Sequence, residues 1–248
     1  MILTSKNNPL IKETATLKEK KGRRQSGLFL VEGVKMAKEC QESGLVLDRV
    51  FVSERYDGAP FENAVTVSED VLRYLSDEKT PQGVVCRVKI PKRTLCPPSG
   101  KCLLLDGVSD PKNMGAIIRT ANAAGYNELY LTDDCTDPFS PKSVRASMSG
   151  VFFTKLYFGT REEILNVLSG VPIVVADMDG ENVFRFQAPE KFALVIGNEG
   201  NGVSDEVAKV AKNTVRIPMQ NTQESLNAGV SAGILMYLLS KDDFTSEN

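Results

Sequence analysis

Two segments of the chain place asparagine, glycine and isolated charged residues where they could act on a phosphate-bearing ligand. In the first, Asn113 precedes Arg119 by six residues at the start of a predicted helix over 114–124. Asn113 is a favourable N-cap residue, and Arg119 would lie in the second turn, where a cation opposes the helix dipole. A phosphate beside Arg119 would offset that cost, and the alternative is an ordinary surface arginine. In the second, the glycines of Gly197-Asn-Glu-Gly-Asn-Gly202 would let a ligand approach the backbone closely, although such loops are often plain turns.

A third segment follows a predicted strand at 215–217. It contains Ile217-Pro-Met219 and, further along, Ser225 and Asn227. Ser225 could cap the last helix, whereas no structural role for Asn227 is evident from the sequence. The chain has neither G-x-G-x-x-G spacing nor Gly-Lys-Ser/Thr after its glycine loop, so nicotinamide and nucleoside triphosphate enzymes are disfavoured.

The absence of histidine from the chain narrows the possible chemistry. It excludes Ser-His-Asp and Cys-His catalysis and histidine metal sites. The five cysteines contain no C-x-x-C pair, so we expect no metal site and no disulfide framework. Reduced, buried thiols are expected at Cys40, Cys86, Cys96, Cys102 and Cys135.

Short apolar runs alternate with helical patterns through most of the 248 residues. After residue 100 the alternation predicts an α/β domain with a mostly parallel sheet, whose ligands bind beyond the carboxyl ends of the strands. Strands are expected at 102–105, 128–131, 154–157, 173–176, 193–196 and 215–217, and helices at 114–124, 142–148, 161–168, 205–212 and 225–239.

The first part of the chain predicts a smaller α/β/α layer domain. Its helices are expected at 8–20, 34–41 and 69–75, with Gly22 ending the first, and its strands at 28–31, 46–52 and 83–90. The proline-rich segment 91–100 suppresses both helix and strand. The predicted domains are therefore 1–93 and 101–248, joined by a linker at 94–100.

The chain as a whole has a net charge of −2, but its N-terminal region is basic: the first 24 residues contain seven basic and two acidic residues. Such a cluster can mark a contact with a nucleic-acid backbone, and a solvated helix end is an equal alternative. Lys142 and Arg145 form a second basic pair on one face of a predicted helix. The predicted RNA-binding residues are Lys18, Lys20, Lys21, Arg23, Arg24, Lys142 and Arg145.

The three polar segments together resemble the signature motifs of the SpoU (TrmH) family, which are S-adenosylmethionine-dependent RNA ribose 2′-O-methyltransferases of the SPOUT class. The resemblance covers residues 100–240, and the N-terminal part resembles the L30e-like substrate-binding domain of the ribosomal-RNA branch. It implies an α/β fold with a deep trefoil knot in the catalytic domain. It also implies a homodimer whose site is completed across the interface.

The resemblance also implies roles for individual residues. The catalytic group would be Asn113, Arg119, Glu199, Ser225 and Asn227. S-adenosylmethionine would contact Gly197, Glu199, Gly200, Ile217, Met219 and Leu226. Because a free arginine stays protonated, we assign Arg119 to orienting a phosphate and stabilising the developing alkoxide, whereas Glu199 would orient Arg119 or bind the ribose.

The expected substrate is ribosomal RNA, specifically that of the large (23S) subunit. Methylation of transfer RNA and a catalytically silent RNA-binding protein are the alternatives. The longest apolar runs are far shorter than the ~20 residues of a membrane span, and no signal peptide is evident, so a cytoplasmic protein without a membrane partner is expected.

Overall fold

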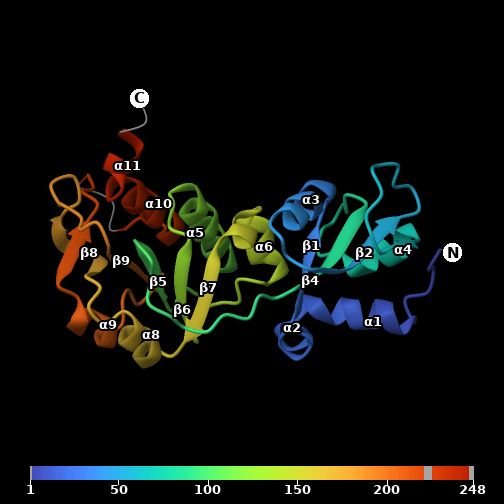
Figure 1. Cartoon of the computed structure of the whole chain (residues 1–248), viewed down its shortest axis with the longest axis horizontal. Coiled ribbons are helices and arrows are strands. Elements are labelled where there is room, and N and C mark those ends of the chain that lie inside the picture. The colour runs from blue at the N-terminus through green and yellow to red at the C-terminus, as the bar shows by residue number, and fades with distance from the viewer. Residues whose placement is uncertain (1, 221–224, 246–248) are drawn as a thin grey trace. The chain divides into compact units, whose positions relative to one another are not determined.

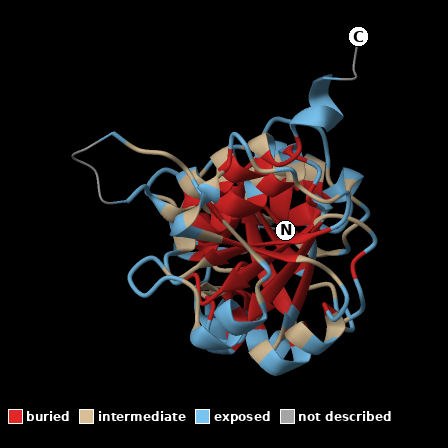
Figure 2. Ribbon diagram, turned by 90° about the vertical axis from the view of Figure 1, so that its left-hand side faces the viewer, coloured by how far each residue is buried: buried red, intermediate tan, exposed pale blue. Residues whose placement is uncertain are grey.

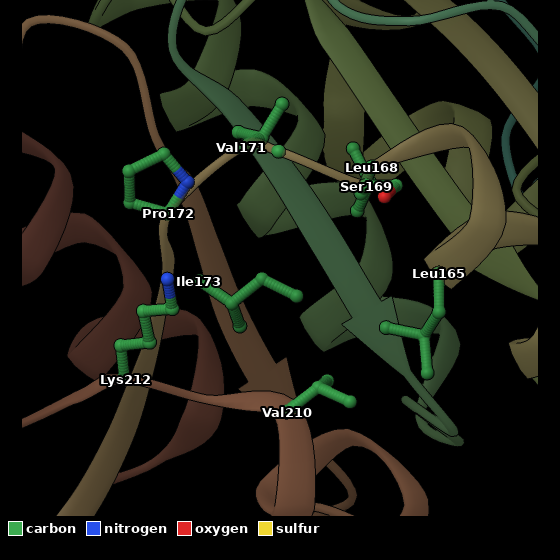
Figure 3. Close-up of a pocket in the computed structure, with 9 residues that line it drawn as sticks. Leu165, Leu168, Ser169, Val171, Pro172, Ile173, Val210 and Lys212 are labelled. Atoms are coloured by element: carbon green, nitrogen blue, oxygen red, sulfur yellow. The ribbon is translucent and has the colours of Figure 1, made fainter.

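The computed structural model describes residues 2–220 and 225–245, which fold into two compact units. The first unit contains Met1–Lys92 and Asp137–Phe152, and the second contains Arg93–Thr136 and Phe153–Asn248. Buried residues concentrate in the strands, whereas helices and loops carry the exposed ones (Figure 2). No helix within the described residues is long and apolar enough to cross a membrane.

The first unit is built on a four-stranded sheet with the order β1-β4-β2-β3. The strands are β1 (Leu28–Glu32), β2 (Leu47–Ser53), β3 (Ala64–Val67) and β4 (Val84–Lys89). β4 pairs antiparallel with β1 and β2, and β3 pairs parallel with β2. The helices are α1 (Pro9–Ala15), α2 (Lys20–Ser26), α3 (Val34–Glu42) and α4 (Glu69–Leu75), with a 3-10 turn η1 (Thr16–Lys18) after α1. Strand β3 was not predicted from the sequence.

Gly22 does not end the first helix, as predicted, but lies inside α2. A Cβ at this position would lie 2.1 Å from the carbonyl oxygen of Thr16, so only glycine lets α2 pack directly against the preceding turn. The single helix predicted over 8–20 is therefore two shorter helices, and the chain bends between them at Glu19, whose backbone is extended.

The segment Asp137–Phe152, which the sequence analysis placed in the second domain, belongs to the first unit. It carries α6 (Pro141–Ser147) and the start of α7 (Gly150–Phe153). The ring of Phe139 lies 5.0 Å from that of Phe29 in β1, and Asp137 forms an ion pair with Arg23 of α2. These contacts depend on residues more than a hundred positions apart, which local sequence patterns do not show.

The second unit is built on a six-stranded sheet of parallel strands with the order β10-β8-β9-β5-β6-β7. The strands are β5 (Cys102–Asp106), β6 (Glu128–Thr132), β7 (Lys155–Gly159), β8 (Ile173–Asn182), β9 (Ala193–Gly197) and β10 (Asn213–Arg216). The helices are α5 (Pro111–Ala123), α8 (Arg161–Val167), α9 (Asp205–Val210), α10 (Ala228–Leu238) and α11 (Lys241–Thr245). Helices α5 and α10 lie on one face of the sheet, and α8 and α9 lie on the other (Figure 1). The predicted parallel α/β fold is confirmed.

Strand β8 continues well beyond the predicted 173–176. Its pairing with β10 jumps from Thr214 opposite Val175 to Val215 opposite Glu181. A Cβ at Gly180 would lie 2.6 Å from the backbone of Thr214. Glycine at this position therefore allows the backbones of β8 and β10 to lie close together at the register shift.

Candidate active site

The polar loops that follow β5 and β9 meet at one edge of the parallel sheet. These two strands are neighbours, and Asp106 at the end of β5 lies opposite Gly197 at the end of β9. Because the strands are parallel, their carboxyl ends open onto the same side, where ligands of such sheets bind. The start of α10 joins the same place through the side chain of Asn227.

A chain of amide and carboxylate side chains connects the three segments singled out in the sequence. Nδ2 of Asn227 donates to Oδ1 of Asn113 at 2.9 Å, and Nδ2 of Asn113 donates to Oε1 of Glu199 at 2.9 Å. Asn113 is buried, so both ends of its amide are held in a fixed orientation. The predicted grouping of these three residues is therefore present in the folded chain.

The carboxylate of Glu199 accepts four hydrogen bonds. In addition to the bond from Asn113, Oε2 accepts from the backbone N–H and the hydroxyl of Ser109 at 3.0 and 2.7 Å, and Oε1 accepts from the N–H of Asp110 at 3.1 Å. Desolvation raises the pKa of Glu199, but the hydrogen bonds from Asn113 and Ser109 outweigh it and lower the pKa to about 2. Glu199 therefore stays ionised at neutral pH and is a weak proton acceptor, which favours a positioning role.

Internal contacts shape the glycine loop. A Cβ at Gly197 would lie 2.4 Å from the backbone of Gly202, so this glycine is required by the fold of the loop itself. Asn198 donates to the carbonyl oxygen of Gly107 at 2.8 Å, and its Oδ1 accepts from the N–H groups of Gly200 and Asn201. Asn198, which sequence reasoning did not single out, thus ties the loop after β9 to the loop after β5.

A charged network supports the same loops from the side of α8. The buried carboxylate of Asp106 accepts from Nε of Arg161 and from the N–H of Ser204, both at 2.7 Å. Nη2 of Arg161 donates to Asp134 at 2.6 Å, and Asp134 also accepts from the hydroxyl of Thr132. Sequence reasoning missed this network, although an aspartate that ends a fully apolar strand was a signal that could have indicated it.

Arg119 does not join the amide chain. It is exposed, and it has no hydrogen bond or ion pair with any residue in the described ranges 2–220 and 225–245. At 3.6 residues per turn it lies about 120° around α5 from Asn113. Within the described part of one chain, Arg119 forms no hydrogen bond or ion pair with Glu199. The expectation that Glu199 orients Arg119 or binds the ribose therefore stays a prediction.

The helix caps differ from those predicted. Asp110, not Asn113, is the N-cap of α5, with Pro111 in the first turn. Asn227, not Ser225, is the N-cap of α10, and its Oδ1 accepts from the N–H groups of Gly229 and Val230 at 3.0 and 3.2 Å. Asn227 therefore has the structural role that the sequence analysis did not find.

The remaining predicted residues are Gly200 in the glycine loop and Ile217, Met219, Ser225 and Leu226, and the last four flank in sequence residues 221–224, which lie outside the described ranges. Ile217 and Met219 are half-buried, whereas Gly200, Ser225 and Leu226 are exposed. Apolar side chains at 217, 219 and 226 and the backbone at Gly200 are therefore at least partly accessible.

The basic cluster of the first unit divides into two kinds of residue. Arg23 is buried, donates to the carbonyl oxygens of Leu17 and Lys18 and forms an ion pair with Asp137, so the prediction that it contacts RNA is wrong. Lys20, Lys21 and Arg24 are exposed. Lys18 is half-buried, and its ammonium lies 5.6 Å from the ring centre of Tyr74.

Lys142 and Arg145, the second predicted basic pair, also differ in their surroundings. Lys142 is exposed on α6, whereas Arg145 forms ion pairs with Asp77 at 2.7 Å and Glu78 at 3.0 Å. The charge of Arg145 is therefore already balanced within the unit.

Four of the five cysteines are buried as predicted, but Cys96 is exposed because it lies in the segment that joins β4 to β5. Across the described ranges, no group of three or more histidine, cysteine, aspartate or glutamate side chains could hold a metal ion.

The fold and the site define an α/β protein whose polar ligand site is assembled from loops at the carboxyl edge of a parallel sheet. Comparison with known proteins identifies the family. The model described as "SpoU rRNA Methylase family" matches residues 100–237, and the "MRM3-like substrate binding domain" matches residues 8–86. The chain belongs to the SpoU rRNA methylase family, which confirms the resemblance seen in the sequence.

Relatives cover nearly the whole chain. The 23S rRNA (guanosine(2553)-2′-O)-methyltransferase RlmP of Bacillus subtilis is 30% identical over 244 residues, covering 96% of this chain and 98% of that protein. The AdoMet-bound rRNA methyltransferase from Sinorhizobium meliloti superimposes with a TM-score of 0.88 at 27% identity, covering 98% of each chain. The SpoU methyltransferase AviRb from Streptomyces viridochromogenes, in complex with AdoMet, gives 0.86 at 26% identity, covering 96% of this chain and 99% of that chain.

Proposed function

We propose that this protein transfers a methyl group from S-adenosylmethionine to a ribose 2′-hydroxyl of ribosomal RNA, in the large subunit. The observation that carries the proposal is the hydrogen-bonded chain Asn227–Asn113–Glu199, which joins all three polar segments at one edge of the sheet. Relatives that cover at least 95% of this chain, RlmP and the 23S rRNA (uridine(2479)-2′-O)-methyltransferase of Streptomyces viridochromogenes, are named for this reaction.

The residues predicted to bind the cofactor have accessibilities that fit this role. A Cβ added at Gly200 would meet only Oδ1 of Asn198, at 3.6 Å, so the backbone here is open to a ligand. The half-buried Ile217 and Met219 and the exposed Leu226 supply apolar contacts for a planar group. Gly197, Glu199, Gly200, Ile217, Met219 and Leu226 would hold S-adenosylmethionine, which supplies an electrophilic methyl group.

The protein's contribution to the reaction is orientation and electrostatic stabilisation. The exposed guanidinium of Arg119 would bind the phosphate beside the target ribose and stabilise negative charge on the attacking oxygen. The hydrogen bonds among Asn113, Asn227 and the ionised Glu199 would fix the positions of the surrounding loops. Ser225 would contact the substrate. Because the pKa of Glu199 is about 2, we do not assign it as the proton acceptor.

The first unit would deliver the RNA. Its match to a substrate-binding domain supports this assignment, and Lys20, Lys21, Arg24 and Lys142 offer exposed cations to the phosphate backbone. Lys18 would contribute from the edge of the same cluster.

We further propose a homodimer whose second copy completes the site. Arg119 reaches no partner in the described part of its own chain, and α10 presents exposed apolar residues such as Val230 and Tyr237. The trefoil knot and the cytoplasmic location implied by the family belong to the same proposal.

Transfer RNA is the less favoured substrate. A solved structure whose title names the 2-OH methylation of C/U34 on tRNA superimposes on only 58% of this chain, with a TM-score of 0.54. The large-subunit rRNA relatives cover at least 95% of it. A catalytically silent RNA-binding protein is disfavoured because the amide–carboxylate chain is intact.

The test is methyl transfer with radiolabelled S-adenosylmethionine to ribosomal and transfer RNA from a strain that lacks this gene. We expect label in the large ribosomal RNA, recovered after digestion as one 2′-O-methylated nucleoside. Label in transfer RNA, label on a base, or no transfer to any of these RNAs would contradict the proposal.

A further inference from the structure

The first unit contains a cavity of about 240 Å³, and all of its lining residues belong to that unit. We call it the Met148 cavity. Its lining includes Leu30, Met36, Gln82, Val144, Arg145 and Met148. It is smaller than the ~300–1,000 Å³ typical of sites for drug-sized molecules, so it suits a single flat ring system rather than a whole cofactor. Leu30 and Val144 are buried and give it an apolar side.

Arg145 presents a fixed planar cation to this cavity. Its guanidinium is held by Asp77 at 2.7 Å and Glu78 at 3.0 Å, yet its side chain remains 42% exposed. The two carboxylates balance its charge, which makes it a poor phosphate ligand. A guanidinium held in one plane is, however, a surface on which an unstacked base packs.

Gln82 offers an unused amide at the same cavity. It is exposed, and it forms no hydrogen bond with any residue in the described part of the chain. A Cβ at Gly33 would lie 2.8 Å from Oε1 of Gln82, so the amide lies close against the backbone of Gly33. One donor and one acceptor side by side are what the hydrogen-bonding edge of a base requires.

Met148 lines the cavity in a strained backbone conformation. Its φ of 50° and ψ of −134° lie in a region that L-residues rarely adopt, and its side chain is 38% exposed. Strain of this kind persists where the surroundings impose it and concentrates at functional sites. The polarisable thioethers of Met148 and Met36 can adapt to an aromatic ring.

We propose that the Met148 cavity receives one unpaired base of the RNA substrate, stacked on Arg145 and the methionine side chains, with Gln82 bonding the edge of the base. Sequence-specific RNA recognition commonly uses such splayed bases. The inference rests on the proposed function, because it assumes an RNA substrate. It adds a base-reading site to a domain whose other candidate contacts are phosphate contacts.

Methyl NMR of the full-length protein, labelled with ¹³C at its methionine methyl groups, tests the proposal directly. AMP, GMP, CMP and UMP are added separately in the presence of excess S-adenosylmethionine, which occupies the proposed cofactor site. We expect at least one nucleotide to shift the Met36 and Met148 signals saturably, while ribose 5-phosphate does not and Met178 in the second unit stays unchanged. Equal shifts with ribose 5-phosphate, or no shift with any nucleotide, would overturn the proposal.

A variant separates binding from folding. Because glycine tolerates a positive φ, Met148→Gly should keep or raise the melting temperature while removing the stacking side chain. Its affinity for ribosomal RNA should fall about ten-fold without a change in salt dependence, whereas Val46→Ala, at an exposed position of the same unit, should bind normally. Normal binding by Met148→Gly would overturn the base-reading role. Methyl transfer by the wild-type protein is scored separately, so failure of the proposed function remains distinguishable.

Discussion

The side-chain amide of Asn113 donates a hydrogen bond of 2.9 Å to Oε1 of Glu199, 86 residues further along the chain. The same amide accepts from Asn227 through its oxygen, so one buried asparagine links the loops after β5 and β9 to the start of α10. Both the nitrogen and the oxygen of this amide thus form a hydrogen bond, which fixes the orientation of the side chain. A change in any of the three segments should therefore disturb the others.

Glu199→Gln tests this coupling. All four groups that contact the carboxylate are donors, so a glutamine NH₂ must face at least one donor in place of an acceptor. Because the site is partly exposed, we expect a loss of only about 1 kcal/mol in unfolding free energy, with a clearly weaker affinity for S-adenosylmethionine. Urea denaturation and calorimetry measure the two effects. Equal affinity in the variant and the wild type would show that the bonds of Glu199 do not shape the cofactor site.

The lowered pKa of Glu199 predicts a dependence on acid. A carboxyl group whose pKa in the folded state is about 2, below the ordinary value of 4.5, stabilises the fold at pH values above 4.5. That contribution is lost as the pH falls from 4.5 towards 2. The difference in unfolding free energy between the wild type and Glu199→Gln should thus shrink from pH 6 to pH 3. A difference that stays constant over this interval would mean that the carboxylate is not stabilised by its donors.

Arg161→Met should destabilise the second unit more than the exposed neighbouring change Asp134→Asn. The first variant leaves the buried carboxylate of Asp106 with the N–H of Ser204 and no charged partner among the described residues, at a cost of about 3 kcal/mol. Asp134 is 49% exposed, so losing its charge should cost less than about 1 kcal/mol. Thermal and urea denaturation of both variants provide the comparison. Similar losses would show that the Asp106–Arg161 pair does not support the loops as described.

The parts of the fold that were predictable from sequence are those set by short-range patterns. Strands β5, β6 and β9 are short, mostly apolar segments, and their observed bounds differ from the predicted ones by at most one residue. β8 was predicted too short because Asp177 and Asp179 interrupt its apolar run, and only its pairing with β10 extends it. Gly22 was misinterpreted for a similar reason, since its need for close contact with Thr16 is visible only in three dimensions.

The candidate site was predictable where its residue types are unusual, and not where a distant partner decides the role. Asn113, Glu199 and Asn227 were selected together and do meet. The charge of Arg23 suggested an RNA contact, but its partner Asp137 lies 114 residues away, and burial follows from that pairing.

The revised basic cluster makes a prediction about RNA binding. Replacing the exposed Lys20, Lys21 and Arg24 together by glutamine should weaken binding of ribosomal RNA and reduce the slope of its salt dependence, because each cation displaces counterions from the phosphate backbone. Affinity for S-adenosylmethionine should not change. Arg23→Gln should instead lower the stability of the first unit, since it removes an ion pair and two hydrogen bonds to the backbone carbonyl oxygens of Leu17 and Lys18. Filter binding at several salt concentrations and thermal melting distinguish the two kinds of residue.

Arg119→Ala is the most direct test of the proposed chemistry. Because Arg119 is exposed and has no partner in the described part of its chain, the fold and the affinity for S-adenosylmethionine should be retained. If the guanidinium stabilises charge that develops only in the transition state, the rate should fall by about 10²–10³-fold, as when one preorganised electrostatic donor is removed. Arg119→Lys should recover little of this loss, since a compact ammonium does not reproduce the planar fork that binds a phosphate. The measurement is single-turnover methyl transfer with saturating RNA and cofactor, and a near-normal rate in the alanine variant would remove Arg119 from the catalytic group and leave Ser225 as the next residue to test.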